Sequence, residues 1–297
     1  MRPDISLFDE KDTCGYPVST LQKQQWLVEL KLADQFIRIC EKYDLKYIAA
    51  GGTLLGAVRH SGFIPWDDDM DFFLPYNDYR KFCEIAPLEI ALPYAFQQKL
   101  TLSRIRDSNT TGCTTYELEH ATDKDNLGIF IDIFPLTKIP DSILERKIHK
   151  VLVRILRIAN RGKDRKEYLQ YKHEDHISMW FEPKILLYEF VSIFCKDLNS
   201  TYIELCGAYE NRNTKELAVT SFLTYNNKYI WNTEWFCERI THTFENRVLK
   251  IPKQYDAILR KCFGDYNKFD MKASQHTLSI VDPETPYKEY VKKRSMI

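Results

Sequence analysis

Long hydrophobic runs are missing from this sequence of 297 residues. No apolar stretch approaches the roughly 18 residues that a membrane-spanning helix needs. Residues 1–14 contain no apolar core of the kind that secretory signal peptides carry, so we expect no signal peptide. The eight cysteines form no Cys-x-x-Cys pair, which argues against a zinc site of the usual spacing. These absences predict a cytoplasmic protein with reduced thiols.

The chain also has no excess charge of either sign. Lys and Arg total 42, Asp and Glu also total 42, and the formal net charge is therefore zero. A neutral chain has no global attraction for nucleic acid or for a membrane, so any electrostatic function must be local. We accordingly expect no nucleic-acid partner. Hydrophobic residues make up 44% of the sequence, which is enough to build a sizeable core.

Hydrophobic periodicity predicts alternating helices and strands in the first half of the chain. Residues 20–45 have apolar side chains at helical spacing, and Ser19 stands at the expected N-cap. Short apolar runs predict strands at 46–50, 70–75, 94–99, 102–108 and 127–136. We expect Gly128 and Pro135 to bound the last of these strands. The pattern indicates an α+β fold, with a mixed β-sheet flanked by helices.

After Pro140 the sequence pattern changes from alternating helices and strands to mainly helical segments. We expect three parts: residues 1–140, a mainly helical subdomain or insertion at 141–240, and a C-terminal segment at 241–297 that packs back on the first part. Residues 146–162 combine Lys and Arg with an apolar stripe. The favoured interpretation is a core-facing helix with a solvated basic face, and the alternative is contact with an anionic membrane.

The stretch "IPWDDDMDFF" contains four carboxylates within a span of five residues, namely Asp67, Asp68, Asp69 and Asp71. A solvated turn fits poorly, because apolar residues flank the stretch on both sides. A calcium-binding loop also fits poorly, since it needs Gly at its sixth position and Glu at its twelfth, where this chain has Phe72 and Asp78. Burying unpaired carboxylates is costly, so some cation must offset their charge.

A divalent-metal site on a strand is the remaining interpretation. Alternate side chains of a strand share a face, so Asp69 and Asp71 would point the same way. Asp132 stands alone in the apolar run "GIFIDIFPL" and would complete a three-carboxylate pocket if its strand lies beside the first. Oxygen ligands of this kind suit Mg²⁺ or Mn²⁺. The preceding stretch "GGT" has glycines that permit close approach of backbone N–H groups to phosphate.

These motifs resemble the polymerase-β-like nucleotidyltransferase superfamily, which combines a Gly-Gly or Gly-Ser pair, an Asp-x-Asp pair and a third carboxylate on a neighbouring strand. The stretch "GGTLLGAVRHSGFIPWDDDMDF" is similar to the signature of the LicD family. Further similar stretches are "LSRIRDSNTT", "GIFIDIFPL" and "FENRVLKIPKQYDAILRKCFGDY". The resemblance covers about residues 30–140 and 240–267.

The resemblance implies a metal-dependent phosphotransferase. LicD proteins transfer phosphocholine from CDP-choline to a hydroxyl of a cell-surface glycan (lipopolysaccharide, teichoic acid or capsule) and release CMP. The related fukutin group transfers ribitol phosphate from CDP-ribitol. We therefore expect a CDP-alcohol donor, first of all CDP-choline, and a glycan acceptor, free or lipid-linked. The expected location is the cytoplasm, with peripheral contact at the inner face of the membrane as an option.

Roles for individual residues follow from the resemblance. Asp69, Asp71 and Asp132 would be both the catalytic residues and the ligands of Mg²⁺ or Mn²⁺, and Asp132 would alternatively take the acceptor proton. Asp67 and Asp68 stay open between a ligand role, a supporting role and a turn cap. The residues expected to contact substrate are Gly51, Gly52, Thr53, Arg59, Trp66, Arg104 and Arg106.

Several alternatives stay open at this point. Each arginine could equally serve a structural ion pair, and Trp66 could pack its loop or face a quaternary ammonium. The same carboxylates would serve a nucleotidyltransferase that uses an NTP, or a catalytically silent metal-binding protein. Residues 1–140 would form the catalytic core, with the acceptor bound by 141–240. The sequence does not decide which alcohol is transferred.

Overall fold

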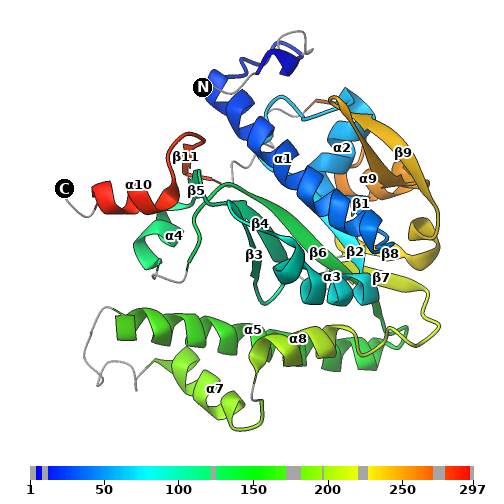
Figure 1. The fold of residues 1–297 in the computed structure, drawn as a ribbon. Helices are drawn as coiled ribbons and strands as arrows, with labels where there is room; N and C mark the ends of the chain where they lie inside the picture. The colour runs from blue at the N-terminus through cyan, green and yellow to red at the C-terminus, as the bar shows by residue number, and fades with distance from the viewer. Residues whose placement is uncertain are drawn as a thin grey trace.

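The computed structural model describes residues 5–8, 13–121, 125–171, 182–195, 197–219, 227–269 and 278–294. A curled mixed β-sheet runs through the middle of the molecule, with the first helix of the chain on one side and helices from the middle of the chain on the other (Figure 1). The predicted fold class, a mixed sheet flanked by helices, is confirmed.

The main sheet has seven strands among the described residues, in the order β1-β2-β6-β4-β3, with β7 paired to β6 and β8 paired to β7. The strands are β1 (Ile48–Ala49), β2 (Asp71–Pro75), β3 (Tyr94–Gln98), β4 (Ser103–Asp107), β6 (Phe130–Ile139), β7 (Glu216–Val219) and β8 (Ile230–Asn232). Strands β2 and β6 are parallel, whereas β6 is antiparallel to both β4 and β7. Strand β6 is therefore the centre of the sheet.

Strand β6 runs through Pro135, so the expected boundary of the strand at this proline is wrong. The N–H of Asp132 donates to the carbonyl of Met70 beside β2, at 3.0 Å. Because backbone groups alternate along a strand, the nitrogen of Pro135 faces the opposite edge. That edge pairs with β4 as far as Ile133 and with β7 from Leu136. Pro135 lies between the two partners, where a missing N–H interrupts no ladder.

Helices α1 (Thr20–Lys42) and α3 (Tyr76–Glu89) pack against the strands β2, β4 and β6. Ser19 caps α1 as predicted, because its hydroxyl accepts the N–H of Gln22 at 3.1 Å. Phe36 of α1 packs against Phe72 of β2 with ring centroids 4.8 Å apart. These contacts build the main hydrophobic core on this face of the sheet.

Helices α5 (Ile143–Tyr171), α7 (Pro183–Ser192) and α8 (Leu198–Cys206) form a separate layer (Figure 1). They enclose a second, smaller core of apolar side chains that includes Val153 of α5 and Tyr202 of α8. The expected domain boundaries at 140 and 240 stay a prediction.

Strands β7 and β8 come from the same region of the chain but belong to the main sheet. The apolar run "LAVTSF" at 217–222 predicts a strand from the sequence, and its first three residues belong to β7, whereas residues 220–222 lie outside the described part of the chain.

The remaining elements are η1 (Ser6–Phe8), α2 (Gly51–His60), β5 (Thr111–Cys113), α4 (Thr115–His120), η3 (Asn227–Tyr229), η4 (Thr233–Phe236), β9 (Arg239–Phe244), β10 (Arg247–Pro252), α9 (Tyr255–Phe263), β11 (Ile280–Asp282) and α10 (Tyr287–Arg294). Strands β9 and β10 form a hairpin that contacts α2 and β1, and β11 pairs with β5. In the ranges described above, no helix is both long enough and apolar enough to cross a bilayer.

Candidate metal and phosphate site

A row of polar side chains crosses four neighbouring strands at one level of the main sheet. Asp71 of β2 pairs in register with Asp132 of β6, which pairs with Arg104 of β4, which in turn pairs with Gln97 of β3. Residues in register on adjacent strands direct their side chains to the same face. The predicted adjacency of the two aspartate strands is confirmed, although the catalytic role of their side chains stays a prediction.

Three further carboxylates gather in the loop before β2. Single side-chain oxygens of Asp67, Asp68 and Asp69 lie within 4.8 Å of one another, close enough to share one metal ion. Asp68 is buried, whereas Asp67 and Asp69 are half-buried. The oxygen-only donor set fits a hard divalent cation such as Mg²⁺ or Mn²⁺. The geometry thus adds Asp67 and Asp68, left open by the sequence, to the candidate ligands.

Side chains of α1 hold the backbone of this loop. The amide of Gln22 and the indole N–H of Trp26 both donate to the carbonyl of Asp67, at 3.1 and 3.0 Å. The amide of Gln25 donates to the carbonyl of Asp68 at 2.7 Å. The sequence analysis missed this support. The sequence feature that could have indicated this support is the spacing of Gln22, Gln25 and Trp26, which places three hydrogen-bond donors on one face of the helix.

The electrostatics of the loop call for a cation. Burial, and then the neighbouring carboxylates, raise the pKa of Asp69 and of Asp71 well above the usual range. Arg104 is the cation that opposes these increases. Glu29 of α1 is buried nearby, and its burial raises its own pKa well above the usual range. A divalent cation would remove most of the repulsion between these groups.

The N-terminus of α2 faces the same carboxylates. Ala50 at its N-cap provides no side-chain hydrogen bond, so the first N–H groups of the helix are left for an anion. A Cβ atom on Gly51 would lie 2.8 Å from Oδ2 of Asp71, and one on Gly52 would lie 2.2 Å from Oδ2 of Asp67. Only glycine therefore allows the carboxylates to approach this helix end so closely.

Thr53 of α2 is committed to the fold at this point. Its hydroxyl oxygen accepts the backbone N–H of Asp71 at 2.8 Å and so fixes the start of β2. The three predicted phosphate contacts of Gly51, Gly52 and Thr53 stay predictions.

Two arginines of β4 lie beside the row. Arg104 donates from Nε to Oδ1 of Asp132 at 2.7 Å and from Nη1 to Oε1 of Glu117 at 3.1 Å. Arg106 is only 1% exposed and donates to the carbonyl of Gly128 at 2.7 Å. Burial lowers the pKa of Arg106 to about 10. The present contacts of both arginines are structural, and their predicted contacts with phosphate stay predictions.

Arg59 and Trp66 form a separate cluster with the C-terminal segment. Arg59 donates to the carbonyl of Tyr266 at 2.8 Å, and its guanidinium lies 5.5 Å from the ring of Trp66 and 5.1 Å from that of Phe269. Trp66 is only 4% exposed. Its ring therefore packs the loop and already faces a cation, Arg59. The predicted substrate contacts of these two residues stay predictions.

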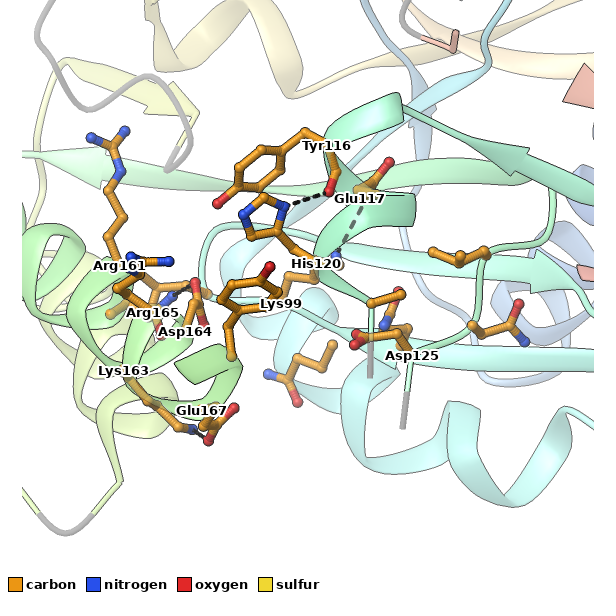
Figure 2. A pocket seen from close by; sticks show the side chains of 18 of the residues that line it. Lys99, Tyr116, Glu117, His120, Asp125, Arg161, Lys163, Asp164, Arg165 and Glu167 are labelled. Atoms are coloured by element: carbon orange, nitrogen blue, oxygen red, sulfur yellow. Dashed lines mark hydrogen bonds and ion pairs between the residues drawn. The ribbon is translucent and has the colours of Figure 1, made fainter. Parts of the chain in front are cut away.

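A groove of about 400 Å³ opens at the β3 end of the polar row (Figure 2). Its walls come from the sheet, α4 and α5, and include Gln97, Lys99, Arg106, Tyr116, Glu117, His120, Asn160, Arg161, Arg165 and Tyr168. The ring of His120 stacks on Tyr116 at 3.9 Å and lies 4.4 Å from Tyr168 of α5. Glu117 connects this groove to Asp132 through Arg104. The sequence analysis did not find the groove.

Comparison with known proteins gives consistent matches. The family model described as LicD/FKTN/FKRP, nucleotidyltransferase domain, matches residues 44–151. The lipopolysaccharide cholinephosphotransferase LicD of Haemophilus influenzae is 26% identical over 265 residues, which are 86% of this chain and 94% of that protein. An uncharacterised protein of Rickettsia prowazekii is 34% identical over 100 residues, covering 34% of this chain and 35% of that protein. One of Rickettsia typhi is 50% identical over 46 residues, covering 16% and 15%.

Proposed function

Residues 44–151 belong to the LicD family, and on that premise we propose that this chain is a phosphotransferase that moves phosphocholine from CDP-choline to a hydroxyl of a cell-surface glycan, with release of CMP. The observation that carries the proposal is the register pair of Asp71 and Asp132 in front of the glycine start of α2. Lipopolysaccharide is the acceptor named for the relative from Haemophilus influenzae.

The proposed reaction is a direct displacement at phosphorus. The acceptor hydroxyl oxygen forms a bond to the outer phosphorus of the donor, and the bond from that phosphorus to the bridging oxygen breaks. CMP leaves with the electron pair of the broken bond, and the hydroxyl proton passes to a carboxylate, for which Asp132 is the candidate. Mg²⁺ or Mn²⁺ held by Asp67, Asp68, Asp69 and Asp71 would supply charge neutralisation for the diphosphate and the leaving CMP.

The α2 N-terminus is the proposed seat of the diphosphate. The uncapped N–H groups of Gly51 and Gly52 and the positive end of the helix dipole favour an anion there. Arg104 holds Asp132 in place and would compensate its charge until substrate arrives. The donor phosphates would therefore lie between the helix end and the carboxylate row, where the acceptor can approach from the β3 side.

We propose that the groove at α4 and α5 binds the glycan acceptor. Its amide, carboxylate and guanidinium groups are planar and can pair with neighbouring hydroxyls of a sugar (Figure 2). The stacked rings of Tyr116 and His120 offer an apolar face of the kind that sugar C–H groups pack against. This assignment gives residues 141–240 the acceptor-binding role expected from the sequence.

The first experiment is to measure CMP release from a panel of CDP-alcohols, with a crude glycan acceptor, in Mg²⁺ or in EDTA. We expect CMP from CDP-choline in Mg²⁺ only, and a loss of at least about 100-fold in Asp69→Asn. Asp44→Asn, an exposed aspartate beyond the far end of α1, is the control. Turnover by Asp69→Asn at the wild-type rate would overturn the assignment, and release of pyrophosphate in a parallel assay with NTPs would replace it with nucleotidyl transfer.

A further inference from the structure

A second cavity, of about 170 Å³, opens directly beside Asp71 and Gly51. Its walls are mostly apolar, and six of the lining side chains are aromatic: Phe73, Phe134, Tyr229, Trp231, Phe236 and Phe263. Trp231 is the centre of this aromatic wall, since its ring lies 5.9 Å from Phe73 and 5.6 Å from Phe236. The cavity was not anticipated from the sequence, because its rings come from β2, β6, η3, β8, η4 and the last residue of α9.

The cavity lies one step along the strands from the candidate metal site. Phe73 follows Asp71 by two residues on β2, Phe134 follows Asp132 by two residues on β6, and the two rings are in register. Residues two apart share a face and are about 7 Å apart along the strand. The two-carbon link between the phosphate and the ammonium of phosphocholine spans a comparable distance. A phosphate held at the carboxylate row would therefore place its alcohol in this cavity.

The chemistry of the walls selects among the candidate alcohols and the cytosine base. A polyol or a base must exchange several hydrogen bonds with water for hydrogen bonds with protein. Among the lining residues that the structure describes, polar side-chain groups are limited to those of Asp71, Tyr229 and Cys262 and the single indole N–H of Trp231. A trimethylammonium group has no hydrogen bonds to replace and is attracted both to ring faces and to a carboxylate.

A cation of this chain already occupies part of the aromatic surface. The ammonium of Lys228 lies 5.7 Å from the ring of Tyr229 and 5.6 Å from that of Phe263, at the edge of the cavity. These ring faces thus attract an alkylammonium group in the structure itself.

We propose that this aromatic cavity holds the trimethylammonium group of choline and so makes the enzyme select CDP-choline over CDP-ribitol and CDP-glycerol. The inference rests on the proposed function and adds the place where the choline group of the donor binds. The base of the donor then lies elsewhere, on the far side of the diphosphate.

The test is direct binding of two probes to the full-length chain, measured by calorimetry in Mg²⁺. Phosphocholine carries the trimethylammonium group, and 3,3-dimethylbutyl phosphate has the same shape without the charge. The variant is Phe263→Leu, which removes one ring that is 44% exposed. The control is Phe194→Leu, which removes a 74% exposed ring two residues beyond the end of α7, outside the cavity.

We expect wild type to bind phosphocholine at least tenfold more tightly than the neutral probe. In Phe263→Leu, the affinity for phosphocholine should decrease about threefold to tenfold, and the affinity for the neutral probe should stay within twofold of wild type. The reason is that only a cation is attracted electrostatically to the ring face. Equal affinity for the two probes, or equal losses of affinity for both in Phe263→Leu, would overturn the proposal. The binding needs no turnover, so absence of CMP release in the first experiment would reject the proposed function without deciding this one.

Discussion

At the scale of single residues, the site is defined by crowding. Two aspartates, Asp67 and Asp71, lie against the start of α2, where Gly51 and Gly52 make the approach possible, and three further aspartates lie beside these two. The sequence placed Asp71 and Asp132 on two strands, and the register of β2 with β6 confirms that these strands are neighbours, whereas the roles of the aspartates stay a prediction. It could not predict the use made of the arginines. Arg106 looks like a phosphate ligand in the sequence, yet it is buried against backbone carbonyls, and only the strand register reveals this.

Without metal, the free energy of unfolding should decrease as the pH rises. The raised pKa values of Asp69 and Asp71 mean that the native state binds protons that the unfolded chain has released. This stabilisation is complete below a pH of about 4 and is lost as the pH rises through the native pKa values. Thermal melts in EDTA should therefore show a falling melting temperature from pH 5 to pH 8.

Mg²⁺ should flatten this pH dependence, since it offsets the same charges that protons offset. Asp69→Asn should reduce the pH dependence of the melting temperature even without metal, whereas Asp44→Asn should have the same pH dependence as wild type. Identical slopes in EDTA and in Mg²⁺ for the wild-type chain would contradict a metal site at these aspartates.

Gly52→Ala should reduce both activity and stability. In most helices this change stabilises by about 0.5–1 kcal/mol. Here the new Cβ would meet Oδ2 of Asp67 at 2.2 Å, so either the helix start or the aspartate must move. We expect at least a tenfold loss of CMP release and a lower melting temperature. The double variant Gly52→Ala with Asp67→Gly should recover the melting temperature, and failure to do so would rule out this clash.

At the scale of elements, the helices and strands of the core were largely predictable. Helix α1 and strands β1 to β4 follow from periodicity and turn residues. They lie within or close to the helix predicted at 20–45 and the strands predicted at 46–50, 70–75, 94–99 and 102–108. The course of β6 through Pro135 was not predictable, because it depends on which partner pairs with each edge. The cavity and the groove were also out of reach. Their walls combine residues that only the tertiary fold brings together.

Helix α1 is expected to control metal affinity through its contact with the aspartate loop. In Gln25→Leu, the carbonyl of Asp68 and the carboxyl of Glu29 both lose their donor. Leaving buried polar groups without a partner costs about 1–3 kcal/mol. Urea denaturation should show this loss, and the Mg²⁺ concentration for half-maximal activity should rise severalfold.

The neighbouring Gln24→Leu is the matched control, because Gln24 donates to Glu284 on the surface. Should Gln25→Leu and Gln24→Leu have the same half-maximal Mg²⁺ concentration, α1 would have no part in holding the loop for metal.

At the scale of the whole molecule, α5 leaves an apolar strip uncovered. Val153 and Leu156 face the second core, as the favoured interpretation of the helix expected. Five other apolar side chains of its first half are exposed: Ile143, Leu144, Ile148, Val151 and Leu152. Lys147, Lys150 and Arg154 alternate with them and are exposed too. A basic and apolar strip of this kind complements an anionic bilayer, and α5 lies on the side of the molecule away from α1 (Figure 1).

The chain should therefore sediment with anionic vesicles. We expect binding to phosphatidylglycerol vesicles, weak binding to phosphatidylcholine vesicles, and a decrease with added salt. Ile148→Ser with Leu152→Ser should reduce binding at least fivefold. Leu88→Ser is the control, because Leu88 is 86% exposed on α3. If the fraction of protein that sediments were the same with anionic and neutral vesicles, or the same for wild type and the double variant, this surface would not be the one that binds the membrane.

The register of β2 with β6 also sets the order of events as the chain is synthesised. Asp71 and Asp132 are about 60 residues apart in the chain and meet only through a parallel pair, which forms slowly because a long loop must close first. A nascent chain that ends before β6 already contains the four proposed metal ligands, Asp67, Asp68, Asp69 and Asp71, but lacks Asp132, the proposed proton acceptor. The proposed site would therefore become competent for transfer only when β6 pairs with β2, after the proposed ligands have already been synthesised.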